Sequence, residues 1–197
     1  DLEMGQSPRQ NVFIGAEAVD RPGVYEALPF FEPQEVDEST RFDIERVQEL
    51  AERPGRVVPL PRERVQREFG LTTDTWSTGD LRFTIYSPFR PVPDPETAGD
   101  DELKEALMPA VLAELTVDNR RGTTPRRAFF GYEGTDPYSS MRTWVSEERG
   151  IVGVGQGRMT AIATDAPDAL CAVRFSIENA VESPAPENRN FGLGKVA

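Results

Sequence analysis

Alternation of hydrophobic and polar side chains constrains the fold of this chain more than any other feature of its sequence. It occurs in three stretches, Leu81–Tyr86, Val111–Val117 and Cys171–Ile177. Because successive side chains of a β-strand point to opposite faces, each stretch predicts a strand with one buried face. The residues predicted to be buried in the first two stretches are Leu81, Phe83, Ile85, Val111, Ala113, Leu115 and Val117.

Turn sequences between such stretches predict how the strands are connected. Ser77–Asp80 (STGD) and Asp118–Thr123 (DNRRGT) have the composition of hairpin loops. The second loop is expected to join Val111–Val117 to a strand within Arg126–Tyr132. Consecutive hairpins produce antiparallel sheet, so we predict a mainly β protein, an antiparallel β-sandwich with few short helices. Shorter strands are expected in Asn11–Gly15, Val65–Leu71 and Gly157–Thr164.

Helical signals are sparse. Asp100–Leu107 carries three acidic residues at its start and Pro109 just beyond its end, which is typical of a short helix. Phe42–Ala51 is a second, weaker candidate. Hydrophobic periodicity ends near Asn179, so we predict one β-sandwich domain over residues 1–180 and a loop or linker over residues 181–197.

Composition excludes several classes of site. The 197 residues include no histidine and one cysteine, Cys171, so they cannot supply a Ser–His–Asp triad or a His-ligated metal site. We predict neither a metal nor a cofactor. The net charge of −12 disfavours nucleic acid and anionic membranes as partners. No apolar run approaches the length of about 20 residues that spans a bilayer. A cytoplasmic location is expected, although the chain does not begin with methionine and secretion stays open.

The segment Arg126–Arg142 (RRAFFGYEGTDPYSSMR) is the strongest functional candidate. A strand ending at Tyr132 is expected to lead into a turn at Gly134–Pro137, where aromatic and acidic side chains gather. Such a loop can present a polyhydroxylated ligand, because aromatic rings pack on sugar C–H faces while charged groups bind hydroxyls. The favoured alternative is a structural turn in which Asp136 accepts a bond from its own backbone.

Four segments together resemble the N-terminal region of glycoside hydrolase family 52, the β-xylosidases. They are Pro8–Gly15, Asp74–Pro88, Arg126–Arg142 and Gly153–Arg158, in the family's order. The resemblance implies an enzyme that releases xylose from the non-reducing ends of xylo-oligosaccharides with retention of configuration. It also implies a downstream (α/α)6 barrel and, as a further partner, a possible homodimer.

Catalytic residues are not expected in this chain. Glu133 and Asp136 form a tempting acid–base pair, but the resemblance implies that the family's catalytic carboxylates lie in segments with no counterpart here. We therefore expect the chain alone to be inactive. The residues expected to contact substrate are Glu133, Asp136, Tyr138, Arg142 and Trp144.

Two further expectations concern the same region. Gly153–Arg158 (GVGQGR) lacks the third glycine and the βαβ context of a dinucleotide-binding motif, so it predicts a glycine-rich strand edge or bulge where another backbone comes close. Aromatic side chains between Tyr132 and Trp144 are expected to form an exposed apolar patch.

Two alternative functions stay open, a non-catalytic carbohydrate-binding β-sandwich and a purely structural interaction domain.

Overall fold

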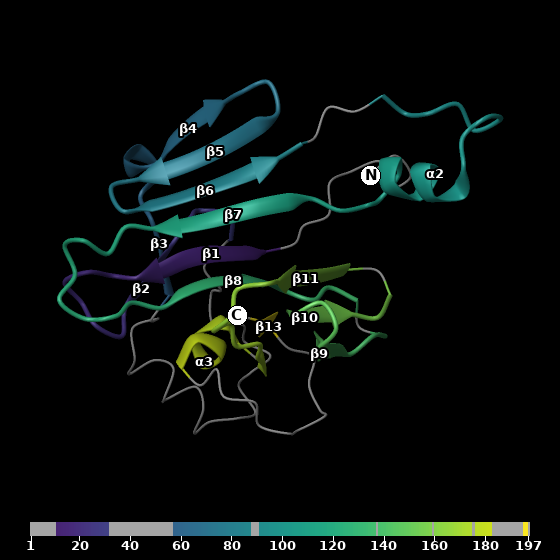
Figure 1. The fold of residues 1–197 in the computed structure, drawn as a ribbon. Coiled ribbons are helices and arrows are strands. Elements are labelled where there is room, and N and C mark those ends of the chain that lie inside the picture. The colour runs from purple at the N-terminus through teal and green to yellow at the C-terminus, as the bar shows by residue number, and fades with distance from the viewer. Residues whose placement is uncertain are drawn as a thin grey trace. The chain divides into compact units, whose positions relative to one another are not determined.

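The computed structural model describes residues 11–31, 57–87, 91–136, 138–158, 160–174, 176–182 and 195–196. The chain divides into two compact units. The split unit combines Asp1–Pro61 with Arg121–Ala197, and the inserted unit consists of Arg62–Arg120. Each unit has its own sheets, as the ribbon in Figure 1 shows.

Three sheets make up the described part of the split unit. Their strand orders are β3-β2-β1-β8, β11-β10-β9 and β12-β13, and neighbouring strands are antiparallel except for the parallel pair β2–β3. The strands are β1 (Val12–Glu17), β2 (Tyr25–Ala27), β3 (Val57–Pro59), β8 (Ala128–Tyr132), β9 (Met141–Ser146), β10 (Ile151–Gln156), β11 (Thr160–Thr164), β12 (Val173–Arg174) and β13 (Lys195–Val196).

Helix α3 (Ile177–Glu182) covers the first of these sheets. Its residues Ile177, Ala180 and Val181 share one helical face and pack into a buried cluster with strand residues such as Phe13 and Phe129. The Ser176 hydroxyl accepts a hydrogen bond from the backbone N–H of Asn179 at 3.2 Å and thereby caps the start of the helix.

A second cluster joins β8 to the β11-β10-β9 sheet. Tyr132 packs with Met141 and Val154, and the half-buried Cys171 lies against this group. The Tyr132 hydroxyl donates to the carbonyl oxygen of Thr160 at 3.1 Å, which satisfies its polar end. Burial raises the pKa values of the Tyr132 hydroxyl and of the Cys171 thiol. Sheet packing of this kind is consistent with the predicted β-sandwich.

The inserted unit is a four-stranded antiparallel meander in the order β4-β5-β6-β7. Its elements are the 3₁₀ helix η2 (Arg62–Arg64), β4 (Gln66–Phe69), β5 (Thr73–Thr78), β6 (Leu81–Tyr86), α2 (Asp100–Ala106) and β7 (Leu112–Val117). Alternation places Trp76 and Phe83 on one face, where their rings pack 5.8 Å apart. The opposite face carries threonines and charged side chains.

Several predictions from the sequence are confirmed by these elements. The protein is mainly β with short helices, and Leu81–Tyr86 forms β6 with Leu81 and Phe83 buried. The predicted helix at Asp100–Leu107 is α2, one residue shorter. The other helical candidate, Phe42–Ala51, lies outside the described residues.

Three local predictions are wrong. The loop at Asp118–Thr123 is not a hairpin, because β7 pairs with β6 whereas β8 pairs with β1. Among the described residues of the stretch Cys171–Ile177, the strand is limited to Val173–Arg174, and the cap at Ser176 begins α3 at Ile177. In the β7 stretch, Val111 and Ala113 are exposed, because only the end of β7 that carries Leu115 and Val117 is covered.

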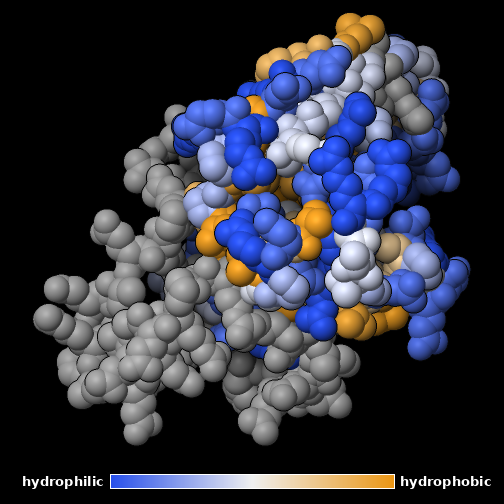
Figure 2. All heavy atoms as spheres, turned by 90° about the vertical axis from the view of Figure 1, so that its left-hand side faces the viewer, coloured by the Kyte–Doolittle hydropathy of each residue, from blue (hydrophilic) through white to orange (hydrophobic). Residues whose placement is uncertain are grey.

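Among the coloured residues in Figure 2, hydrophilic ones predominate on the face shown, and hydrophobic ones lie in separate groups between them. This distribution accords with an acidic chain whose apolar side chains lie largely inside its sheets.

Two phenylalanines on the same face of the inserted sheet, one on the inner strand β6 and one on the edge strand β4, provide a direct stability test. Phe83 is 3% exposed and Phe69 on the same sheet is 69% exposed. Phe83→Ala is expected to lower the free energy of unfolding by about 3–5 kcal/mol, the range for a buried ring. Phe69→Ala should cost at most about 1 kcal/mol, the value of an exposed ring beneath an arginine. Urea unfolding measures both losses, and equal losses would contradict the difference in burial between the two rings.

Candidate functional site

The turn between β8 and β9 begins at Glu133, directly after the buried end of β8. The Glu133 carboxylate accepts a hydrogen bond from the side-chain amide of Asn11 at 2.8 Å. The Glu133 backbone N–H also donates to the carbonyl oxygen of Asn11 at 2.9 Å. The start of the turn is therefore tied to the residue that precedes β1.

Asp136 shapes the tip of the turn. Its carboxylate accepts a hydrogen bond from the backbone N–H of Tyr138 at 2.8 Å, so the structural alternative of an Asx-type turn is confirmed. A hydrogen bond from the Ser139 side chain and this backbone bond lower the pKa of Asp136 below its ordinary value of 3.8. The carboxylate consequently stays ionised at neutral pH.

The side chain of Gln156, at the end of β10, is hydrogen-bonded to the backbone of the turn. Its side-chain Nε2 donates to the carbonyl oxygens of Asp136 and Ser139, both at 2.8 Å, and its Oε1 accepts from the Asp136 N–H at 3.4 Å. The Gln156 side chain is buried. A Cβ on Gly134 would lie 2.9 Å from this amide, so only glycine fits there without displacing it. No sequence pattern marks Gln156, because its role depends on a contact with a residue twenty positions away in the chain.

Trp144 and Arg142 project from β9 on the same face, two residues apart. Trp144 is paired with Gly153 of β10, and a Cβ on Gly153 would lie 2.6 Å from its indole Cζ2. The predicted approach of another backbone is confirmed at Gly153, where a Cβ would also lie 2.6 Å from the carbonyl oxygen of Ile162, but β10 is the central strand of its sheet and not an edge. Arg142 is exposed, and its Nε donates to the hydroxyl of Ser140 at 3.4 Å.

The aromatic side chains of this region differ widely in exposure. Tyr138 is 96% exposed and Trp144 is 38% exposed, so both can contact a ligand or another surface. The expectation that exposed aromatics extend to Tyr132 is wrong, because that ring belongs to the buried cluster between the sheets. Alternation along β8 turns Tyr132 inward.

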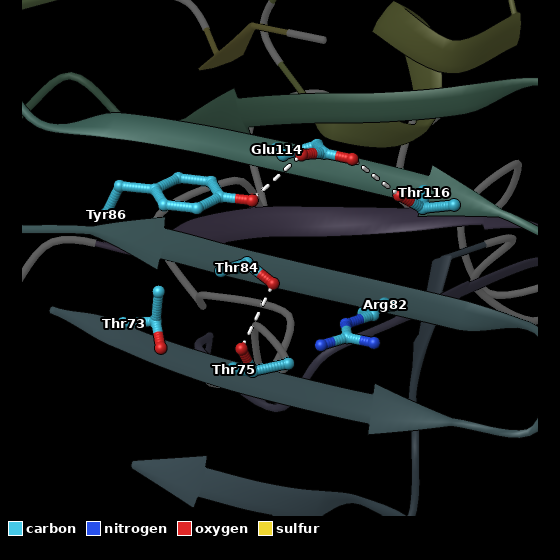
Figure 3. A pocket seen from close by; sticks show the side chains of 7 residues that line it. All are labelled: Thr73, Thr75, Arg82, Thr84, Tyr86, Glu114 and Thr116. Carbon is cyan, nitrogen blue, oxygen red and sulfur yellow. Dashed lines mark hydrogen bonds between the residues drawn. The ribbon is translucent and has the colours of Figure 1, made fainter. Parts of the chain in front are cut away.

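A second polar site, which was not predicted from the sequence, lies on the inserted unit. It is a pocket of about 310 Å³ on the polar face of the strands β5, β6 and β7 (Figure 3). No single motif marks it, because its residues meet only when three strands align in register. They are Thr73, Thr75, Arg82, Thr84, Tyr86, Glu114 and Thr116.

Among the described residues, no cluster of three or more Cys, Asp or Glu side chains is arranged to hold a metal ion. Within those same segments, no helix combines the length and hydropathy needed to cross a bilayer.

Loss of the Gln156 contacts should destabilise the turn. Gln156→Leu leaves two partly buried carbonyl oxygens without their donor, so the free energy of unfolding is expected to fall by about 1–3 kcal/mol. Gln66→Leu on exposed β4 is the matched control and should change stability by less than about 0.5 kcal/mol. Chemical denaturation measures both effects, and a neutral Gln156→Leu would contradict the proposed clamp.

Asp136 should make stability depend on pH in one direction. Because the pKa of Asp136 is lowered in the folded chain, its contribution to the free energy of unfolding is fully present above pH 3.8. This contribution is lost as the pH falls through the lower folded-state pKa. The stability difference between the wild type and Asp136→Asn should therefore shrink as the pH drops below 3.8. Denaturation at a series of pH values measures this difference, with the exposed Asp168→Asn as control. A difference that grows at low pH would refute the assignment.

Comparison with known proteins places this arrangement in a family. Two curated relatives are beta-xylosidases of Geobacillus stearothermophilus. One is 50% identical over 196 residues, which cover 100% of this chain and 28% of the relative, and the other is 47% identical over 171 residues, which cover 83% and 28%. The chain thus spans about 28% of the length of these relatives. The family model described as glycosyl hydrolase family 52 matches residues 1–197, and the chain belongs to this family.

Proposed function

We propose that this chain is part of a retaining β-xylosidase that releases xylose from the non-reducing ends of xylo-oligosaccharides. The observation that carries the proposal is the match to the family 52 model over the whole chain. It is supported by 50% identity to a beta-xylosidase over 196 residues. At this level of identity the sheets and turns described above belong to the same scaffold as the relative's.

The catalytic carboxylates of this enzyme are proposed to lie outside residues 1–197. A retaining glycosidase needs a nucleophilic carboxylate about 5–5.5 Å from a carboxylic acid whose pKa is raised. Asp136 has a lowered pKa and is held by the backbone of its own turn, which is the wrong setting for the acid. Glu133 is bound by the Asn11 amide and serves the base of the same turn.

The turn between β8 and β9 is proposed to contribute to the substrate entrance. Tyr138 and Trp144 offer exposed rings for the C–H faces of a pyranose, and Arg142 offers donors for its hydroxyls. Glu133 and Asp136 complete the proposed substrate-binding set as hydrogen-bond acceptors. The Gln156 clamp supports this assignment, since a binding loop needs a fixed backbone.

The proposed partners follow from the same family membership. A downstream (α/α)6 barrel would supply the catalytic residues, and a homodimer is a further proposed assembly. The length of the relatives supports a further part of the protein, because this chain accounts for only 28% of the matched beta-xylosidase.

The second candidate is a carbohydrate-binding module without catalysis. It is favoured by one observation, the presence of exposed aromatic side chains on a β-rich scaffold where no catalytic pair is apparent among the described residues. This candidate predicts that the complete protein binds xylo-oligosaccharides without hydrolysing them.

Hydrolysis of an aryl β-xyloside distinguishes the two candidates. The full-length protein is expected to release xylose, with the β-anomer appearing first by NMR, whereas the 197-residue chain alone should give no turnover. Binding without hydrolysis by the full-length protein would favour the second candidate. Turnover by the isolated chain that disappears in Glu133→Gln or Asp136→Asn would overturn the proposed location of the carboxylates.

The role of the turn is tested in the full-length protein. Trp144→Ala removes a ring contact worth about 0.5–1.5 kcal/mol, so KM should rise by roughly 2- to 12-fold with little change in kcat. Tyr138→Ala is expected to act in the same direction. Phe69→Ala, which removes an exposed ring from the inserted unit, is the control. Unchanged KM values in both turn variants would exclude the turn from substrate binding.

A further inference from the structure

We propose that the pocket on the polar face of β5, β6 and β7 is a binding site for a neutral saccharide of one or two sugar units. The pocket lies entirely within the inserted unit, and none of the five residues proposed above to contact substrate, which lie in the β8–β9 turn and on β9, contributes to it. Its volume of about 310 Å³ is at the low end of small-molecule sites. Figure 3 shows its seven side chains on one side of the sheet.

The floor of the pocket is a pair of threonines. Thr75 of β5 and Thr84 of β6 are opposite each other in the sheet, and their hydroxyl oxygens lie 3.1 Å apart. Each residue is only 6% exposed. One hydroxyl donates to the other, so the pair retains one free O–H donor and several lone pairs. These groups can exchange hydrogen bonds with the hydroxyls of a ligand at the bottom of the pocket.

One wall of the pocket is an acceptor held in place by its neighbours. The Glu114 carboxylate accepts hydrogen bonds from the Tyr86 hydroxyl at 2.9 Å and from the Thr116 hydroxyl at 3.2 Å. These bonds orient both carboxylate oxygens and leave each with further lone pairs. The bond to Glu114 raises the pKa of Tyr86, which keeps that hydroxyl protonated and donating. The Tyr86 ring adds an apolar edge beside the acceptor.

Arg82 supplies donors on the other side of the floor. Its guanidinium carries five N–H donors, and Figure 3 shows no hydrogen bond between it and the other six lining side chains. Arg82 and Glu114 therefore face a ligand with one set of donors and one set of acceptors. This combination suits vicinal hydroxyls, which both donate and accept.

Other classes of ligand fit the lining less well. A phosphate would be repelled by the Glu114 carboxylate, and a single arginine does not offset that charge. An apolar ligand would bury threonine and charged groups without replacing their hydrogen bonds to water. A neutral saccharide satisfies the hydroxyls, the carboxylate and the guanidinium together. That its units are xylose rests on the proposed function.

Binding to the 197-residue chain tests the site. Titration with xylobiose followed by NMR should shift resonances of residues 73–86 and 112–117, and calorimetry should give the affinity. Arg82→Ala and Glu114→Gln each remove a charged hydrogen-bonding group, so affinity should fall roughly tenfold or more. The matched controls are Arg62→Ala and Glu63→Gln, two exposed residues of η2 in the same unit, and they should leave affinity unchanged.

The possible outcomes of these binding experiments either support or overturn the saccharide site. Absence of saccharide binding, unchanged affinity in both pocket variants, or saturable binding of inorganic phosphate would overturn the site. Shifts confined to residues 133–144 would assign the sugar to the β8–β9 turn and also overturn it. Binding of cellobiose or maltose but not xylobiose, with loss of affinity in Arg82→Ala, would support the site. If the pocket binds a saccharide but the full-length protein does not hydrolyse a β-xyloside, the proposed function is wrong and the binding site stands.

Discussion

Pairing of β1 with β8 is the interaction on which the rest of the split unit depends. The register runs from Val12 opposite Tyr132 to Ala16 opposite Ala128, and it joins segments more than one hundred residues apart. The pairing brings Phe13 and Phe129 into one buried cluster with α3. It also directs Tyr132 into the cluster that holds the next sheet. The inserted unit lies within the chain segment that connects β1 to β8, because it begins after β3 and ends before β8.

The same pairing determines where the β8–β9 turn begins. Asn11 lies one residue before β1 and binds Glu133 through both its side chain and its carbonyl oxygen. Gln156 then fixes the tip of the turn from β10. The exposed Tyr138 is thus carried by a backbone that is hydrogen-bonded at its base and at its tip. A turn fixed in this way loses little further conformational entropy when it binds a ligand.

Local pattern predicted the elements of this fold better than their connections. The alternation of Leu81, Phe83 and Ile85 was sufficient for β6, because one face of that strand is buried. The same reasoning failed at Cys171–Ile177, where a serine cap at Ser176 and a helical spacing of apolar residues favour α3. The loop at Asp118–Thr123 has hairpin composition, but the partner of β8 is β1 and no local signal in the chain specifies a contact of that range.

The two candidate sites were predictable to different degrees. The turn could be found from its sequence, because glycine, proline and aromatic residues occur together within a short segment. The pocket could not, since alternate residues of three strands contribute two or three side chains each and ordinary residues such as threonine form its floor. Gln156 could not be predicted either, because it acts on residues that precede it in the chain by 17 and 20 positions. Sequence spacing identifies groups that are close along one strand, whereas register across strands decides which of them meet.

A crystal structure of the full-length protein with xylobiose tests the central claim most directly, namely that this chain is a substrate-contacting scaffold and not the catalytic centre. We predict that the reacting sugar lies between two carboxylates from outside residues 1–197, about 5–5.5 Å apart. We also predict that Trp144 or Tyr138 contacts a sugar ring. A scissile bond flanked by Glu133 and Asp136 would contradict it.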